Sequence, residues 1–372
     1  MDEKHMPSTV VVKVGTLTLA DEHGNIDPVF MSGFVAQLAE QRRAGRRVAL
    51  VTSGAVRTGM ERLELRKDHP LSVSDKQAAA AVGQGLLMER YTALFESHGL
   101  IAAQVLLTRD IINFRQKYLN ARNTLMRLLE LGVVPVINEN DTVAVDEIKF
   151  GDNDALSAIA AMLVEADMLV LLSDVDGLYD GDPRHNPGAK RIGEVREVTA
   201  EIVAAAGGTR SGGGTGGMTT KVQAARQAMA AGIRTVVAHG RAPDIVRRVI
   251  EGEPAGTTFI PRENGLTSRK KWLAFGVSPQ GRIVINDGAR DKIVAAGTSL
   301  LPVGVVAVQG SFGAGDNVEI VDEKQRPVAR GLSNYSSEDI KKIMGIHSDR
   351  IEQILGYKIS DDVVHRDNMA VM

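Results

Sequence analysis

The first apolar run of the chain reads Thr9-Val10-Val11-Val12-Lys13-Val14, and it stops at Gly15. β-Branched residues dominate this run, and an apolar stretch of this length bounded by glycine predicts a buried strand. Lys13 is the exception. A lysine in this position either extends along apolar neighbours to reach solvent or faces a polar site. Its place two residues before Gly15 favours the site.

Strand-like and helix-like segments alternate from this run to about residue 260. Further strands are predicted at 47–52, 102–107, 133–138, 168–173 and 234–238, and helices near 29–44, 75–97, 115–131, 154–165, 218–231 and 243–251. Alternation of this kind predicts an α/β fold, a mostly parallel sheet sandwiched by helices. Ligands of such sheets bind beyond the carboxyl ends of the strands. Here those ends carry small, polar or charged residues: Lys13-Val14-Gly15-Thr16, Thr52-Ser53-Gly54-Ala55, Asn138-Glu139-Asn140-Asp141 and Ser173-Asp174.

The pattern changes after residue 261. Pro261-Arg262-Glu263-Asn264-Gly265 is typical of a linker, and short strands rich in glycine follow it at 282–286, 304–309, 317–322 and 328–332. Short, evenly spaced strands predict a small β-rich barrel. The chain of 372 residues is therefore expected to hold two domains, at 1–265 and 275–372.

A glycine-rich tract lies in the first domain. Seven of the eleven residues from Gly207 to Gly217 are glycine, and Lys221 follows inside a predicted helix. Glycine lets backbone N–H groups approach an oxyanion, and a helix N-terminus adds positive potential. The tract is not a Walker A loop, because no Gly-Lys-Ser/Thr stands at the required spacing. A flexible linker explains the glycines equally well, so the rest of the chain has to separate the two interpretations.

Two acidic and amide-rich clusters accompany this tract. Asn138-Glu139-Asn140-Asp141 follows a predicted strand, where Asn and Asp also form ordinary turns. Gly151-Asp152-Asn153-Asp154 precedes a predicted helix, and Asn153 or Asp154 would make a good helix N-cap. Capping explains one of these four residues and leaves the others open to a role in a site.

Composition excludes several functional classes. The chain has no cysteine, which excludes disulfides and thiolate metal sites and fits a reducing, cytoplasmic location. Its eight histidines show no metal-ligand spacing, so no metal site built from protein side chains is predicted. No apolar stretch approaches the roughly 20 residues of a membrane span, and the polar residues 1–8 do not resemble a signal peptide. The net charge of −2 argues against a polyanionic partner.

Five segments occur in a fixed order and together resemble the amino acid kinase family, in particular its members that act on free L-glutamate. In chain order these segments are 13–16, 52–55, 134–141, 151–154 and Gly214-Thr215-Gly216-Gly217-Met218-Thr219-Thr220-Lys221. The C-terminal region resembles the PUA domain, a small β-barrel. The resemblance covers nearly the whole chain and implies ATP-dependent phosphorylation of the side-chain carboxylate of L-glutamate, the first step of proline biosynthesis.

The same resemblance implies roles for individual residues. Lys13 and Lys221 would be catalytic and stabilise the transferring phosphate, while Asp154 would hold the two lysines. Substrate contacts are implied for Ser53, Gly54, Asp141 and Asn153. Among these, Asp141 suits the α-ammonium group, Ser53 with the backbone N–H groups around Gly54 suits the α-carboxylate, and Asn153 could donate to a carboxylate. Nucleotide contacts are implied for Lys13, Ser173, Asp174, Thr215, Gly216, Gly217, Met218, Thr219, Thr220 and Lys221.

The chemistry agrees with these residue types. A carboxylate with a pKa of about 4.3 is ionised at neutral pH, so it needs no general base. The difficulty is that an anion must approach a triphosphate, which two lysines and Mg²⁺ can overcome by neutralising charge. Mg²⁺ binds phosphate oxygens and keeps several waters, so few protein carboxylates are required.

Partners and alternatives follow from the resemblance as well. It implies feedback inhibition by proline and a homotetramer. A functional link to glutamyl-phosphate reductase is a separate hypothesis, because glutamyl phosphate is labile and cyclises. Other members of the family act on aspartate, acetylglutamate, carbamate or a nucleotide, and these substrates are the neighbouring alternatives. PUA domains often bind RNA, but residues 275–372 carry 13 Asp and Glu against 11 Lys and Arg, which speaks against RNA here.

Overall fold

The computed structural model describes residues 6–65, 71–113, 115–143, 153–183, 186, 188–207, 217–261 and 279–372. The chain divides into two compact units, Met1–Ile111 with Arg115–Asn264 and Ile112–Phe114 with Gly265–Met372. The domain limits expected from the sequence, 1–265 and 275–372, stay a prediction, because residues 262–278 lie outside the described part of the chain.

The first unit is built on an eight-stranded sheet with the order β3-β4-β2-β1-β5-β7-β8-β6. Its strands are β1 (Thr9–Val14), β2 (Arg47–Val51), β3 (Ala102–Leu107), β4 (Val134–Glu139), β5 (Met168–Ser173), β6 (Glu194–Val195), β7 (Arg234–His239) and β8 (Gly256–Phe259). The six strands from β3 to β7 in this order are parallel, and only β8 runs antiparallel to its neighbour β7. The predicted, mostly parallel sheet is therefore confirmed.

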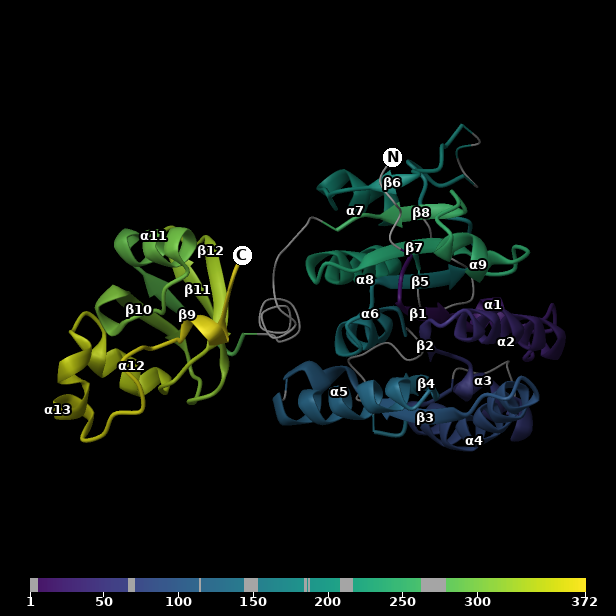
Figure 1. Ribbon diagram of the computed structural model, residues 1–372, viewed down its shortest axis with the longest axis horizontal. Helices are drawn as coiled ribbons and strands as arrows, with labels where there is room; N and C mark the ends of the chain where they lie inside the picture. The colour runs from purple at the N-terminus through teal and green to yellow at the C-terminus, as the bar shows by residue number, and fades with distance from the viewer. Residues whose placement is uncertain are drawn as a thin grey trace. The chain divides into compact units, whose positions relative to one another are not determined.

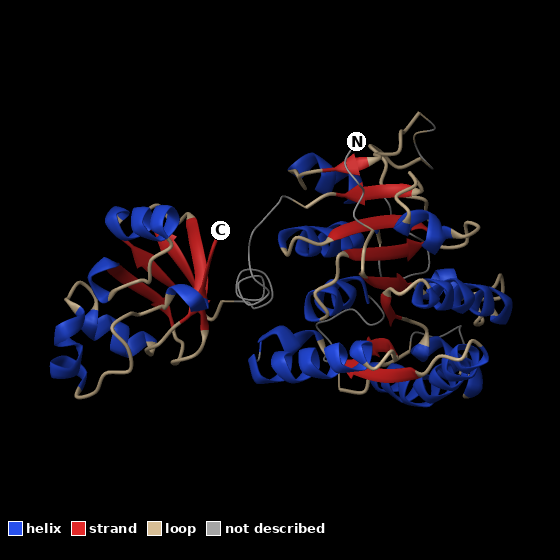
Figure 2. Ribbon diagram, in the orientation of Figure 1, coloured by secondary structure: helices blue, strands red, loops and turns tan. Residues whose placement is uncertain are grey.

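Helices cover both faces of this sheet (Figure 1, Figure 2). Helices α5, α6, α7 and α8 lie on one face, and α1, α2, α3, α4 and α9 lie on the other. Their bounds are α1 (Thr16–Leu19), α2 (Pro28–Arg43), α3 (Ala55–Arg62), α4 (Val73–Ser97), α5 (Arg115–Glu130), α6 (Asn153–Leu163), α7 (Ala200–Gly207), α8 (Met218–Ala230) and α9 (Ile245–Ile250). None of the helices in the described part of the chain combines the length and apolar character that crossing a membrane requires.

Local sequence explains why the two longest helices of one face begin where they do. Asp27 caps α2 by accepting hydrogen bonds from the N–H groups of Val29 and Phe30. Ser72 and Asp75 form a reciprocal capping box at the start of α4. Every residue of β1, β4 and β5 is buried, as expected for strands covered on both sides.

The second unit is a five-stranded sheet with the order β10-β9-β11-β12-β13. Its strands are β9 (Gly281–Ile285), β10 (Val305–Gly310), β11 (Asn317–Asp322), β12 (Pro327–Leu332) and β13 (Met369–Val371). The β-rich character expected from the sequence is confirmed. Helices α11 (Asp287–Ala296), α12 (Ser337–Ile343) and α13 (Ile351–Leu355) were not predicted, although Asn286 and Ser336 are good N-caps and both accept a bond from the backbone N–H three residues on.

Candidate functional site

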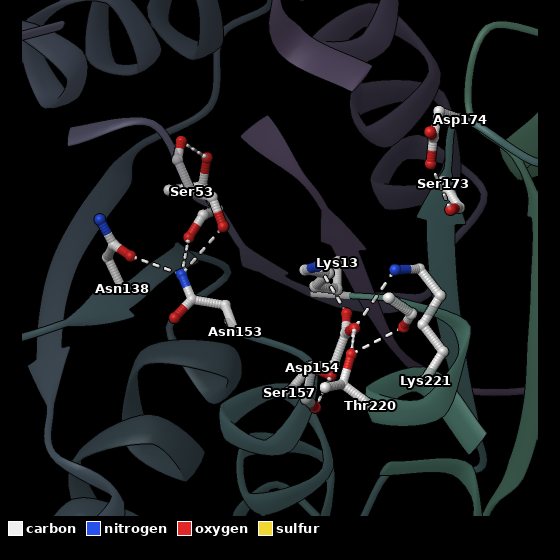
Figure 3. A network of polar contacts seen from close by, with 12 residues as sticks. Lys13, Ser53, Asn138, Asn153, Asp154, Ser157, Ser173, Asp174, Thr220 and Lys221 are labelled. Atoms are coloured by element: carbon white, nitrogen blue, oxygen red, sulfur yellow. Dashed lines mark hydrogen bonds and ion pairs between the residues drawn. The ribbon is translucent and has the colours of Figure 1, made fainter. Parts of the chain in front are cut away.

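The site lies where the central parallel strands end. Strands β4, β2, β1 and β5 are consecutive neighbours in the sheet, so their carboxyl ends meet at one edge. Figure 3 shows the side chains that these ends and helices α6 and α8 bring together. The strand-end residues predicted from the sequence are thus neighbours in space, as the topology of a parallel sheet requires.

Lys13 stands on β1, between β2 and β5, and is only 4% exposed. Its Nζ lies 2.5 Å from Oδ1 of Asp154. The alternative of a lysine that extends to solvent is therefore wrong. A buried ammonium group needs a partner of opposite charge, and the first turn of α6 supplies it.

Asp154 joins two lysines and is fully buried. Its Oδ2 lies 3.3 Å from Nζ of Lys221, a residue in the first turn of α8, and also accepts a 2.8 Å hydrogen bond from Oγ1 of Thr220 (Figure 3). Burial raises the pKa of Asp154, but the charges of Lys13 and Lys221 lower it by more, so the pKa lies well below its usual range. The carboxylate is therefore ionised at neutral pH and holds both ammonium groups.

The end of the glycine tract leads directly into this cluster. Gly217 precedes α8 in an extended conformation, and its carbonyl oxygen accepts a 2.8 Å hydrogen bond from Oγ1 of Thr220. Met218 is 4% exposed and packs into the core, while Oγ1 of Thr219 donates to the carbonyl of Ala206. A contact of Met218 with a nucleotide would therefore have to come from its backbone, whereas Oγ1 of Thr219 can still accept a hydrogen bond. Thr215 and Gly216, also predicted for the nucleotide, lie outside the described residues.

Ser173 and Asp174, the other predicted nucleotide residues, follow the end of β5. Oγ of Ser173 donates to Oδ1 of Asp174 over 3.0 Å. Ser173 is 4% exposed, whereas Asp174 is exposed. Figure 3 places both near Lys13 and Lys221. A carboxylate in this place can accept hydrogen bonds from hydroxyl groups of a ligand.

Ser53, Asn138 and Asn153 form a second buried cluster. Nδ2 of Asn153 lies 2.5 Å from the carbonyl oxygen of Thr52, 2.7 Å from Oδ1 of Asn138 and 3.1 Å from Oγ of Ser53 (Figure 3). Oδ1 of Asn153 is buried and has no hydrogen-bond partner among the described residues. Neither Asn153 nor Asp154 is the N-cap of α6 that the sequence suggested, because the helix begins at Asn153 and both side chains bond to other elements.

Gly54 turns the chain from β2 into α3. Its φ of 107° lies in the left-handed region, where a side chain is strained. A Cβ at this position would also lie 3.2 Å from Cδ1 of Ile26. Glycine here lets the backbone after Ser53 turn sharply, which leaves the N–H groups around it at the carboxyl edge of the sheet.

Asp141 occupies a different environment from Asp154. It is 8% exposed, and its Oδ1 has no hydrogen-bond partner within the part of the chain that is described. Burial raises the pKa of Asp141 to about 7, and the nearby charge of Glu139 acts in the same direction, while Arg109 lowers it. Glu139 is itself paired with Arg109, whose Nε lies 3.4 Å from Oε1 of Glu139. An unpaired buried carboxylate of this kind is suited to a cationic ligand group.

A cavity of about 280 Å³ opens beside Asp141. The end of β4, the edge strand β3 and the middle of α4 enclose it. Its lining includes Gln84, Gln104, Leu106, Glu139 and Asp141. The side chains of α4 that face this site were not predicted, because nothing in a helix rich in alanine marks one glutamine as facing a strand 54 residues away.

The described residues contain no group of three or more His, Cys, Asp or Glu that could hold a metal ion. Asp154, the most buried carboxylate of the site, is already bound by two ammonium groups.

Comparisons with known proteins show which families the chain resembles. Residues 8–239 match the amino acid kinase family, and residues 281–355 match the PUA domain. A glutamate 5-kinase of Thermoanaerobacter sp. (strain X514) is 48% identical over 363 residues, which cover 98% of this chain and 97% of the relative. A glutamate 5-kinase of Moorella thermoacetica is 50% identical over 363 residues, with coverages of 98% and 96%. Among solved structures, a UMP kinase from Bacillus anthracis matches 69% of this chain and 97% of its own, with 17% identity and a TM-score of 0.48.

Proposed function

The chain belongs to the amino acid kinase family, and from this premise we propose that it transfers the γ-phosphoryl group of ATP to the side-chain carboxylate of L-glutamate. The products are L-glutamyl 5-phosphate and ADP, in the first step of proline biosynthesis. Curated glutamate 5-kinases match 98% of the chain, so the family and the activity expected from the sequence are confirmed.

The observation that best supports a phosphoryl-transfer site is the pair of buried lysines on one aspartate. Lys13 and Lys221 come from β1 and α8, and both reach Asp154. Two positive charges buried this close together repel one another, and the carboxylate offsets that repulsion. The three residues carry one net positive charge, which favours binding of an anionic phosphate.

These residues suit a reaction without proton transfer. An ionised carboxylate oxygen of glutamate attacks the γ-phosphorus, the bond from phosphorus to the β–γ bridging oxygen breaks, and ADP leaves. We assign Lys13 and Lys221 to the non-bridging and bridging oxygens that gain charge in this step. Asp154 acts as a positioning residue for both lysines and takes no proton.

For the amino acid we assign the second cluster and Asp141. The α-ammonium group is assigned to the carboxylate of Asp141, and the assignment is supported by its buried Oδ1, which lacks a partner among the described residues. Ser53 and the N–H groups that follow it at Gly54 suit the α-carboxylate. Asn153 is assigned to the amino acid as well, because its Nδ2 contacts Oγ of Ser53.

Mg²⁺ is part of the proposal as the ion that accompanies ATP. The described residues offer no carboxylate cage, which fits an ion bound mainly by phosphate oxygens and water. When bound, the ion would neutralise phosphate charge. Ser173 and Asp174 are proposed for the nucleotide, together with residues 215–221 at the start of α8.

Further properties are proposed from the sequence alone. They are feedback inhibition by proline, a homotetramer, a functional link to glutamyl-phosphate reductase and a location in the cytoplasm, where ATP and free glutamate are both present. We do not propose RNA as a partner. We do propose that the chain divides into domains at 1–265 and 275–372.

A hydroxamate trap tests the activity directly. The protein is incubated with ATP, MgCl₂, hydroxylamine and one acceptor at a time, namely L-glutamate, N-acetyl-L-glutamate or L-aspartate. Hydroxamate should form with L-glutamate, because an acyl phosphate reacts with hydroxylamine. Release of ADP with another acceptor and none with L-glutamate would refute the assignment of the substrate.

A further inference from the structure

Gln84, in the middle of α4, links the cavity to the buried amide cluster. It is 9% exposed and lines the cavity beside Asp141. Its Oε1 accepts a 2.8 Å hydrogen bond from Nδ2 of Asn138 on β4. Gln84 thus contacts the cluster from the side opposite to Asn153, although it is not one of the residues predicted from the sequence.

Two backbone groups fix the direction of the hydrogen bonds in this cluster. The carbonyl oxygen of Thr52 can only accept, so the Asn153 atom 2.5 Å away must be the donor Nδ2. The backbone N–H of Glu139 can only donate, so the Asn138 atom that faces it over 2.9 Å must be Oδ1. Nδ2 of Asn138 then faces Gln84, which must present its oxygen.

This direction determines what the cluster offers to a ligand. The donor Nδ2 of Asn153 is committed to protein oxygens, and its buried Oδ1 has no partner among the described residues. Oγ of Ser53 lies 3.1 Å from Nδ2 of Asn153, which is a donor, so Ser53 keeps its own hydroxyl proton for donation to a ligand. The cluster therefore presents one acceptor and one donor, whereas the sequence alone suggested Asn153 as a donor to a carboxylate.

We infer that Gln84 is a positioning residue for amino acid recognition. Through Asn138 it holds Asn153 with its carbonyl oxygen toward the α-ammonium group of the substrate, while Ser53 donates to the α-carboxylate. The inference rests on the proposed function, because it takes an α-amino acid as the substrate. Oδ1 of Asn153 and Oδ1 of Asp141 would then be two buried acceptors for the three N–H donors of the ammonium group.

Removal of the Gln84 acceptor should weaken recognition of the ammonium group and of nothing else. Gln84→Met keeps the length of the side chain and leaves Nδ2 of Asn138 buried without a partner, so Asn138 has to move and Asn153 loses its support. Gln84→Glu retains an acceptor. Gln227→Met is the matched control, because Gln227 is an exposed glutamine of α8 and does not line the cavity.

The experiment compares kcat/KM for L-glutamate and for glutarate, which lacks the α-ammonium group, at pH 8.5. Gln84→Met should raise the KM for L-glutamate at least about tenfold, the scale of a hydrogen bond to a charged group. The KM for ATP and kcat/KM for glutarate should change less than about threefold. Asn153→Ala should show the same selective loss, and Gln84→Glu and Gln227→Met should keep the preference of the wild type.

Equal losses for both acceptors in Gln84→Met or Asn153→Ala would overturn the inference, and so would an unchanged preference for L-glutamate. If Gln84→Met does not fold, Asn153→Ala has to show the selective loss and Gln84→Glu has to keep the preference of the wild type, and failure of either result overturns the inference. If the wild type phosphorylates L-glutamate but the variants lack the selective loss, the result contradicts only the positioning role of Gln84. A wild type without glutamate turnover contradicts the proposed function first.

Discussion

Asp154 is the residue on which the charge balance of the site depends. Lys13→Ala and Lys221→Ala should each lower kcat at least about a hundredfold, because each removes a charge that stabilises the transition state. The ADP-release assay measures this loss. Lys292→Ala, which removes an exposed lysine of α11, should leave kcat unchanged. A loss of less than tenfold in either buried variant would contradict the catalytic assignment.

Asp154→Asn should destabilise the fold as well as the reaction. The variant leaves two buried ammonium groups without their carboxylate, which costs on the order of 3–5 kcal/mol at pH 7. The pKa of Asp154 is lowered in the folded protein, so its stabilisation is present above the unfolded-state value of 3.8 and is lost as the pH falls toward the folded-state value. Urea unfolding should therefore show a difference between wild type and variant at pH 7. No difference at that pH would contradict the role of Asp154 as the link between the lysines.

Asp141 should make glutamate binding depend on pH near neutrality. Its pKa of about 7 in the free protein means that protons and the α-ammonium group compete for the same carboxylate. The KM for glutamate should rise as the pH falls from 8 to 6, approaching tenfold per pH unit below the pKa. Asp141→Asn should show a higher and flatter KM. A KM for the wild type that does not vary over this range would refute the pairing.

The raised pKa of Asp141 also predicts a cost in stability. Between the unfolded-state value of 3.8 and about 7, the folded protein holds this proton more tightly, so stability falls as the pH rises through that window. Asp141→Asn should consequently unfold at a higher urea concentration than wild type at pH 8. A midpoint below that of the wild type would show that the carboxylate has a stabilising partner instead.

Among the elements, α3 and α4 are the pair that places the amino acid side of the site. A Cβ on Gly83 would lie 1.9 Å from the carbonyl oxygen of Ala55, so the two helices touch backbone to backbone. Gly83→Ala should force them apart and lower the free energy of unfolding by about 1–3 kcal/mol. Gly85→Ala is the control in the same helix, because its Cβ would meet no atom within 4 Å. That variant should be neutral or slightly stabilising, and equal effects of the two changes would contradict the close helix crossing.

Much of the element pattern follows from local sequence. The apolar runs of β1 and β5 and the alternation with helices predict the parallel sheet, and its topology then places Lys13, Asp141 and Asp154 at one edge. The roles of Gln84 and Arg109 could not be predicted. Their contacts join segments 54 and 30 residues apart, and their residue types are common on helix and loop surfaces. Helix α3 was missed because its start depends on the conformation of Gly54 rather than on a capping side chain.

For the whole molecule, charge decides which partners the second unit can hold. This unit matches the PUA domain, yet acidic residues outnumber basic ones between 275 and 372. Nucleic acid binding requires a basic surface that releases counterions. We expect no complex with tRNA at sub-micromolar protein and about 0.15 M salt in a gel shift. A shifted band that weakens steeply with added salt would contradict this expectation.

The structure of the protein with a non-hydrolysable ATP analogue, Mg²⁺ and L-glutamate is the most direct test of the paired lysines. Nζ of Lys13 and of Lys221 should each lie about 2.7–3.2 Å from an oxygen of the terminal phosphate region. The side-chain carboxylate of glutamate should face the terminal phosphorus. Either ammonium group turned to solvent, or bound only to Asp154 and away from the phosphates, would contradict the proposed transfer.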